Sequence, residues 1–206
     1  MITAAATPAW ISDYLERQRG ALSQLPIPAI ARWIDRLREA AGREATIFVA
    51  GNGGNAASAA HFATDLGKGA SDVHATRFRV VCLADNVAWL TALGNDYDYS
   101  DVFVRQLMNF ARPGDLLLTS SVSGNSPNLV KAVEWARTRG VTTLALVGAR
   151  QGRLAALADD VIEVADTHYG RVEDAQMTIL HLLAYAFMEP LSHPPKPASP
   201  TQSTQA

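Results

Sequence analysis

The sequence is poor in three features that would define its surroundings or partners: cysteine, an excess of basic charge, and long apolar runs. It has one cysteine, Cys82, and its 18 Lys and Arg residues against 20 Asp and Glu residues give a formal net charge of −2. We expect Cys82 to be a buried core residue, because it lies inside the apolar segment RFRVVCLAD. One cysteine cannot form an intrachain disulfide, so the sequence suits a cytoplasmic protein. Without a basic excess, binding to nucleic acid is not expected.

No segment approaches the roughly 18 unbroken apolar residues that a membrane helix needs, so we predict no membrane partner. The first residues, MITAAATPAWISDYLERQ, lack a basic region followed by an apolar core, and they do not resemble a secretory signal. Residues 192–206 are rich in Pro, Ser, Thr and Gln, which predicts a disordered tail.

The patterns that are present indicate one α/β domain with helical additions, which a chain of 206 residues can form around a single core. Apolar residues at helical spacing predict two N-terminal helices, over residues 9–25 and 30–42. Short apolar or β-branched runs near residues 46, 77, 115, 142 and 161 then predict buried strands. Between and after them, helices are expected at 55–66, 87–93, 101–111, 128–139, 153–158 and 172–188.

This alternation predicts a three-layer, doubly wound parallel sheet with helices on both faces and an N-terminal helical extension. We expect residues 1–43 to pack on the domain and at a subunit interface, residues 44–191 to form the main domain, and residues 192–206 to form the tail. Ligands of such sheets bind at the carboxyl ends of the strands, where the unusual residues of this sequence fall.

The first candidate loop is GNGGN, residues 51–55, between a predicted strand and a predicted helix. Glycines allow backbone amides to approach an anion, and the start of the helix adds partial positive charge. Residues expected to bind a ligand there are Asn52, Gly53, Gly54 and Asn55. The pattern is neither a dinucleotide fingerprint nor a Walker loop, and a plain tight turn is the alternative.

The second candidate loop is TSSVSGNS, residues 119–126, after another predicted strand. One serine would be explained as a helix cap, but several hydroxyls beside a glycine exceed what capping requires. They match the oxygen atoms of a phosphate monoester, so the loop is expected to bind phosphate through Ser121, Val122, Ser123 and Ser126.

Taken together, the two loops resemble the sugar isomerase (SIS) domain family, and within it the phosphoheptose isomerases. The matching segments are GNGG at 51–54, HFATDL at 61–66, GND at 94–96, SVSGNS at 121–126 and ILH ending at His181. The resemblance implies a flavodoxin-like sheet, a homotetramer with sites between subunits, and a serine loop that grips the phosphate of a phosphosugar. It also implies a divalent metal, zinc in this family, at His61, Asp65, Glu173 and His181.

Several positions depart from the family pattern. The usual glutamate is Asp65, the usual glutamine is Glu173, and the serine after GNGG is Asn55. An arginine expected shortly after the helix is absent, with only Lys68 nearby, and an aspartate usual before the last helix falls at Gly170. Aspartate is shorter than glutamate by about 1.5 Å. A displacement of that size can cost on the order of 100-fold in rate.

The altered residues still permit the chemistry that the resemblance implies. Conversion of a ketose to an aldose needs a base at C1, a path that returns the proton to C2, and stabilisation of the enediolate oxygen. His61 and Asp65 are four residues apart and share a helix face. We expect Asp65, Glu173 and His181 to be catalytic. Asp174 competes with Glu173, since it lies seven residues before His181 rather than eight.

Other interpretations of these residues remain open. His181 lies in the apolar segment ILHLLAYAF and could be a core histidine, and Asp65 could be a solvated helix residue. Asp96 is either a contact to sugar hydroxyls or a catalytic group, or the cap of a helix near Ser100.

The function that the resemblance implies is an enzyme, an aldose–ketose isomerase that converts sedoheptulose 7-phosphate to D-glycero-D-manno-heptose 7-phosphate through an enediol. One alternative is a non-catalytic phosphosugar-binding protein that acts as a regulator or protein partner. The other is an isomerase of a different phosphosugar, because Asn55, Gly69 and Gly170 change what lines the site.

Overall fold

A five-stranded parallel sheet organises the chain in a computed structural model that describes residues 7–189. The strand order is β2-β1-β3-β4-β5, the flavodoxin-like order. The bounds are β1 (Thr46–Gly51), β2 (Arg79–Cys82), β3 (Leu116–Ser121), β4 (Thr142–Gly148) and β5 (Asp160–Val164). All five predicted strands are confirmed. The predicted tail at 192–206 lies outside the described residues.

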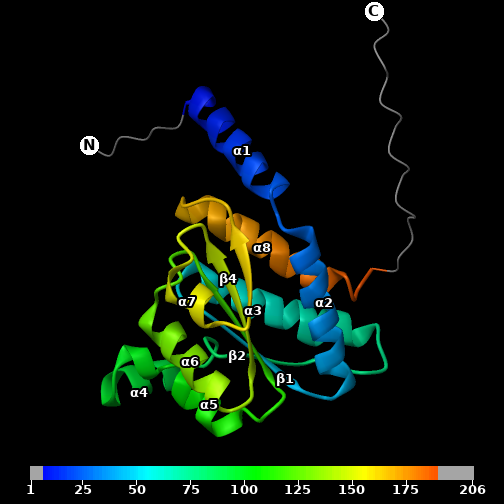
Figure 1. Cartoon of the computed structure of the whole chain (residues 1–206), viewed down its shortest axis with the longest axis vertical. Coiled ribbons are helices and arrows are strands. Elements are labelled where there is room, and N and C mark those ends of the chain that lie inside the picture. The colour runs from blue at the N-terminus through cyan, green and yellow to red at the C-terminus, as the bar shows by residue number, and fades with distance from the viewer. Residues whose placement is uncertain (1–6, 190–206) are drawn as a thin grey trace, which may run out of the picture.

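Helices cover both faces of the sheet (Figure 1). One face is covered by α2 (Ile27–Gly42), α3 (Gly54–Thr64) and α8 (Tyr169–Tyr185), and the other by α5 (Val104–Phe110), α6 (Pro127–Thr138) and α7 (Gly152–Leu157). Side chains alternate along each strand, so Leu116 and Leu118 enter one core while Leu117 enters the other. The predicted three-layer, doubly wound fold is therefore confirmed.

The remaining helices lie at the periphery. The first helix, α1 (Pro8–Ser23), extends beyond the sheet and lies over α8 (Figure 1). Its apolar residues Trp10, Ile11 and Leu15 are about half exposed, at 46–56%. The fourth helix, α4 (Val87–Asp96), buries one residue of its own, Leu93. Both N-terminal helices predicted from the sequence are present.

Two predicted helices differ in their local form. The helix expected over 55–66 ends as an α-helix at Thr64 and continues as the π-helix η1 (Asp65–Ala70), whose two glycines weaken the preference for an α-helix. The helix expected from residue 101 is preceded by the short 3₁₀ helix η2 (Tyr99–Asp101). Its cap is Asp98, whose Oδ1 accepts the Ser100 N–H at 2.8 Å. The suggestion that Asp96 caps this helix was therefore wrong.

Cys82 is 7% exposed, and burial, the largest influence on it, raises the pKa of its thiol to about 12. This confirms the prediction of a buried core cysteine, because a thiol that stays protonated is a poor nucleophile. Within residues 7–189, none of the helices combines the length and the apolar character that spanning a membrane would require.

The carboxylate of Asp160, at the start of β5, fastens α2 to the sheet. Its side chain is 8% exposed and accepts hydrogen bonds from Arg32 Nε and Nη2 at 2.8 and 2.7 Å and from Arg36 Nε at 3.1 Å. The bond from Arg32 is the largest influence and holds the pKa of Asp160 below its usual range, against the opposing effect of burial. The charge is thus stabilised where the helix and the strand meet.

Replacing both Arg32 and Arg36 with alanine should lower the free energy of unfolding by about 3 kcal/mol at pH 7, because it leaves a buried carboxylate unpaired. Since the folded-state pKa of Asp160 is depressed, this stabilisation is present above the unfolded value near 3.9 and disappears as the pH falls through the folded value. The difference from the parent should therefore shrink in acid. Urea denaturation between pH 3 and pH 7 measures it.

Arg17→Ala is the matched control, because its ion pair with Asp13 is about 60% exposed on both sides and should contribute less than about 1 kcal/mol. A double variant no less stable than Arg17→Ala would show that Asp160 does not fasten α2.

Candidate active site

The two candidate loops meet at the carboxyl ends of β1 and β3, which are neighbours in the sheet. Between them lies a small cavity of about 100 Å³. It is lined by Asn52, Asn55, Ser120, Ser121, Val122, Ser123, Ser126, Tyr169 and Glu173. Six of the nine substrate-binding residues predicted from the sequence thus line one cavity, which we call the serine-loop pocket.

Hydrogen bonds fix the amide side chains of this pocket. The buried Ser120 hydroxyl is 2.5 Å from Asn55 Oδ1, to which it donates. The amides of Asn52 and Asn128 donate to each other at 2.9 and 2.8 Å, and the Tyr99 hydroxyl donates to Asn52 Oδ1 at 3.2 Å. The first loop is therefore tied both to β3 and to the start of α6.

The serine hydroxyls retain hydrogen-bonding capacity for a ligand. Ser121 Oγ accepts the Gly124 N–H at 3.1 Å, and Ser123 Oγ accepts the Asn125 N–H at 3.2 Å. Because these oxygens act as acceptors, each O–H remains available as a donor. Ser126 occupies the N-cap position of α6 without a side-chain capping bond. The phosphate role of these hydroxyls stays a prediction.

The first turn of α7, together with the end of the loop before it, holds the serine loop in place. Leu154 N–H donates to Gly124 O and Arg153 N–H donates to Asn125 Oδ1, both at 2.9 Å. Gly124 has a φ of +65°, and a Cβ atom added to it would lie 1.9 Å from the Gln151 carbonyl oxygen. Only glycine fits this position, so the close packing of the two loops sets the shape of the pocket.

Glu173 brings a carboxylate to the pocket from α8. A Cβ atom on Gly54 would lie 2.6 Å from Glu173 Oε2, so the carboxylate lies against the first turn of α3. Among the described side chains that line the pocket, none is cationic. An anion bound here would depend on neutral hydroxyl and amide donors beside one carboxylate.

A second group of functional side chains gathers where α3, η1 and α8 come together. One ligand atom each from His61, Asp65 and His181 lies within 4.8 Å of the other two. Asp65 Oδ2 is 3.3 Å from His61 Nε2 and 3.8 Å from His181 Nε2. The imidazole rings meet edge to face, with centroids 5.1 Å apart. The structure therefore brings together three of the four metal ligands that the family resemblance implies.

This group has the chemistry of a divalent-metal site. Asp65 Oδ2 is buried and accepts no hydrogen bond within the described part of the chain. Two ligands of a tetrahedral zinc ion, each about 2.0–2.1 Å from the metal, lie roughly 3.4 Å apart, close to the distance between His61 and Asp65. Two histidines and a carboxylate are a set that zinc accepts with one position left open. Glu173 is not part of the three-residue group.

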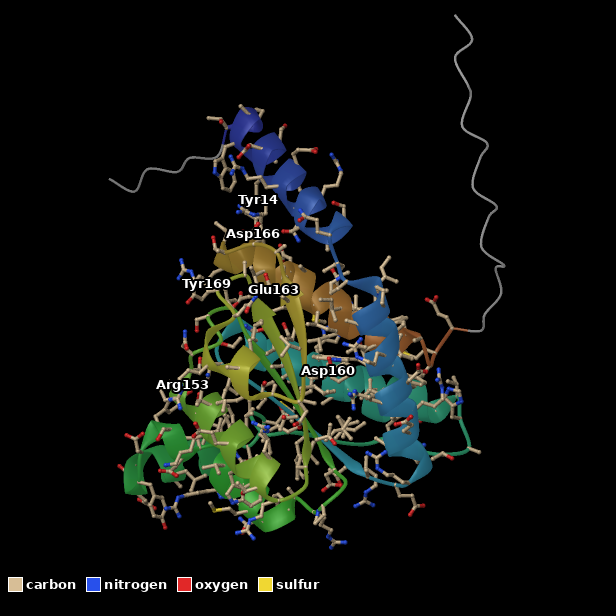
Figure 2. The ribbon with its side chains drawn as sticks, viewed as in Figure 1. Tyr14, Arg153, Asp160, Glu163, Asp166 and Tyr169 are labelled. Atoms are coloured by element: carbon tan, nitrogen blue, oxygen red, sulfur yellow. The ribbon has the colours of Figure 1, made fainter. Side chains whose placement is uncertain are left out.

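The remaining predicted residues lie outside both groups. Asp174, the rival of Glu173, is exposed and lies near Tyr14, whose pKa is raised by burial first and then by the charge of Asp174. The Tyr14 hydroxyl also takes the space over Gly170, 2.8 Å from where a Cβ atom would be. Figure 2 shows Tyr14, from α1, near the end of α8 that carries Tyr169. Asp96 is exposed and accepts a bond from Asn95.

Two residues of the pocket were missed in the sequence. Ser120 lies within β3, where its position reads as ordinary sheet interior, and Tyr169 opens α8, where an aromatic residue has no special signal. The run of three polar residues that ends β3, Thr119 to Ser121, was the one available hint for Ser120.

Gly124→Ala should destabilise the protein by at least about 2 kcal/mol more than Gly114→Ala, because the first adds a backbone clash while both carry the cost of a positive φ. Gly114 has a φ of +92° but no atom within 4 Å of an added Cβ, which makes it a matched control. Thermal unfolding of both variants measures the difference. Equal losses would mean that the two loops separate without cost.

Known proteins share this architecture. The SIS domain family model matches residues 9–148. Phosphoheptose isomerase of Mycobacterium tuberculosis (strain ATCC 25177 / H37Ra) is 40% identical over 150 residues, or 73% of this chain and 76% of that protein. The phosphoheptose isomerase of Rhodospirillum rubrum is 36% identical over 156 residues, which is 76% of this chain and 82% of that protein. The solved structure of the Francisella tularensis phosphoheptose isomerase matches with a TM-score of 0.81 and 27% sequence identity. The match covers 87% of this chain and 96% of that chain. The chain belongs to the SIS domain family.

Proposed function

We propose that this protein is an aldose–ketose isomerase that converts sedoheptulose 7-phosphate to D-glycero-D-manno-heptose 7-phosphate. The observation that carries the proposal is that one helix, α8, contributes a residue both to the serine-loop pocket and to the three-residue group. Glu173 of α8 lines the serine-loop pocket, and His181 of α8 belongs to the group with His61 and Asp65. The similarity to phosphoheptose isomerases supports the same reaction.

The separation of these two groups supports a long phosphosugar. Eight residues of α-helix, from 173 to 181, rise about 12 Å. An extended seven-carbon sugar measures roughly 10 Å from C1 to the phosphorus of a 7-phosphate, from ordinary bond lengths. A substrate with its phosphate in the serine-loop pocket would therefore bring C1 and C2 close to His181 and Asp65.

In this arrangement the chain's own groups carry the phosphate and the proton. The hydroxyls of Ser121, Ser123 and Ser126 donate to the phosphate oxygens. His181 acts as the proton-transfer group between C1 and C2, and Asp65 or Glu173 acts as its partner base. Asn52, Gly53, Gly54 and Asn55 complete the contacts of the first loop with the sugar phosphate, and Asp96 contacts sugar hydroxyls.

A divalent metal, zinc in the first instance, belongs to the proposal. His61, Asp65 and His181 would hold it, while Glu173 lines the serine-loop pocket. When bound, it would polarise the sugar carbonyl and stabilise the negative charge of the enediolate. The buried, unbonded Asp65 Oδ2 supports this part of the proposal.

Assembly and location follow as further parts of the proposal. Residues 1–43 would supply subunit contacts in a homotetramer, and residues 44–191 would form the domain that holds the site. The half-exposed Trp10, Ile11 and Leu15 of α1 support a role in such contacts. A cytoplasmic location rests on the single, buried cysteine.

His61→Ala and His181→Ala should each lower the bound zinc, measured by elemental analysis after dialysis against the metal, from about one ion per chain to near zero, because two ligands bind too weakly. His74→Ala is the matched control, since its Nε2 lies 2.6 Å from the Phe187 carbonyl, outside the three-residue group. Equal zinc in the parent and the His61 and His181 variants would remove the metal from the proposal.

The Ser121→Ala and Ser123→Ala double variant should raise the KM for sedoheptulose 7-phosphate by about tenfold or more, because each lost hydroxyl removes a hydrogen bond to a charged group. Ser23→Ala is the control, because the Ser23 hydroxyl donates to the Gly20 carbonyl within α1 and lies outside the serine-loop pocket. An unchanged KM in the double variant would refute the phosphate assignment.

An Asp65→Asn and Glu173→Gln double variant tests catalysis itself, and its kcat should fall by at least about 100-fold with zinc supplied. If the parent turns over sedoheptulose 7-phosphate no faster than this variant, the function is a non-catalytic phosphosugar-binding protein. Turnover of another member of a phosphosugar panel, with none of the heptose, would change the substrate and keep the reaction.

A further inference from the structure

A second and larger cavity lies at the opposite end of the sheet, where β1, β2 and β3 begin. It has a volume of about 670 Å³. The residues that matter for its chemistry are Arg43, Glu44, Arg79, Val81, Phe110, Arg112 and Asp115. It shares no lining residue with the serine-loop pocket, so it is a separate site, which we call the arginine groove.

Three guanidinium groups from different parts of the chain line this groove. Arg43 follows α2, Arg79 lies on the edge strand β2, and Arg112 precedes β3. All three are exposed, and none forms an ion pair with a carboxylate of residues 7–189. Since the groove also carries the carboxylates of Glu44 and Asp115, its local excess is one positive charge, in a chain of net charge −2.

Hydrogen bonds to the backbone fix two charged side chains of the groove, Arg43 and Asp115. Arg43 Nε and Nη2 donate to the Gly114 carbonyl at 3.2 and 3.0 Å, which anchors the guanidinium. The Asp115 carboxylate is 6% exposed and accepts two backbone N–H groups, of Thr46 and Arg112, at 2.8 Å each. Asp115 therefore shapes the groove, and Glu44 is the other carboxylate along it.

An aromatic ring and an apolar surface lie beside the arginines. Phe110, the last residue of α5, is 49% exposed, and Val81 of β2 is 39% exposed. The Phe110 ring meets Trp89 edge to face, with centroids 5.4 Å apart, so one aromatic neighbour supports it while part of it stays open. A planar ring could stack there within the same groove.

We infer that the arginine groove binds a nucleoside polyphosphate, with the phosphate chain on Arg43, Arg79 and Arg112 and the base against Phe110. A guanidinium group can donate two parallel N–H bonds to the oxygens of one phosphate, which makes arginine suited to a chain of phosphates. Aromatic side chains bind nucleobases by stacking. This site lies outside the isomerase reaction and would act as a binding site for an effector.

Calorimetric titration of the full-length protein with ATP, inorganic triphosphate and adenosine tests the inference. We expect saturable binding of ATP and of triphosphate, with ATP the tighter, and little binding of adenosine. Arg79→Ala with Arg112→Ala should weaken both anions by about tenfold or more. Phe110→Ala should weaken ATP by about threefold and leave triphosphate unchanged.

Arg77→Ala is the matched control, since Arg77 is exposed, paired with Asp72 and outside the groove. Arg79→Lys with Arg112→Lys, which keeps the charge, provides a milder variant should the alanine pair not fold. The inference is overturned if ATP shows no saturable binding at millimolar concentration, or if the alanine and lysine pairs bind it as the parent does. It is equally overturned if Ser121→Ala with Ser123→Ala abolishes ATP binding, because the ligand then occupies the serine-loop pocket. That last variant also separates this site from the isomerase proposal.

Discussion

The need to cover a parallel sheet on both faces is the constraint on which the rest of this structure depends. Strands such as β3 bury every residue, so a polar group within them must find a partner or lie at an end. The helices that cover the sheet also return the chain to the same edge each time. The polar loops after β1, β3 and β4 consequently converge at one edge of the sheet. The position of the candidate site therefore follows from the packing of the helices on the sheet.

Close backbone packing then turns loose loops into a defined pocket. The serine loop and the loop after β4 approach so closely at Gly124 and Gln151 that a side chain is excluded between them. Gln151 itself holds a positive φ of 56°, an unfavourable conformation for a residue with a side chain. Strain of this kind is retained where the surrounding contacts require it, and here those contacts shape the serine-loop pocket.

The sequence was sufficient for the elements of the fold because long apolar runs and helical spacing are local signals. It was also sufficient to predict that His61 and Asp65 lie close together, because a separation of four residues keeps them on one helix face. This holds although a π-helix begins at Asp65. It could not decide between Glu173 and Asp174, because their roles depend on how α8 is rotated against its neighbours. That rotation is set by tertiary packing, which directs Glu173 to Gly54 and leaves Asp174 exposed.

The contact between α1 and α8 has a consequence for substitutions at position 170. The Tyr14 hydroxyl lies 2.8 Å from where a Cβ atom of residue 170 would be, so a side chain at that position would displace the tyrosine from its present place. Substitutions at positions 14 and 170, which are 156 residues apart in the sequence, should therefore affect each other in this fold.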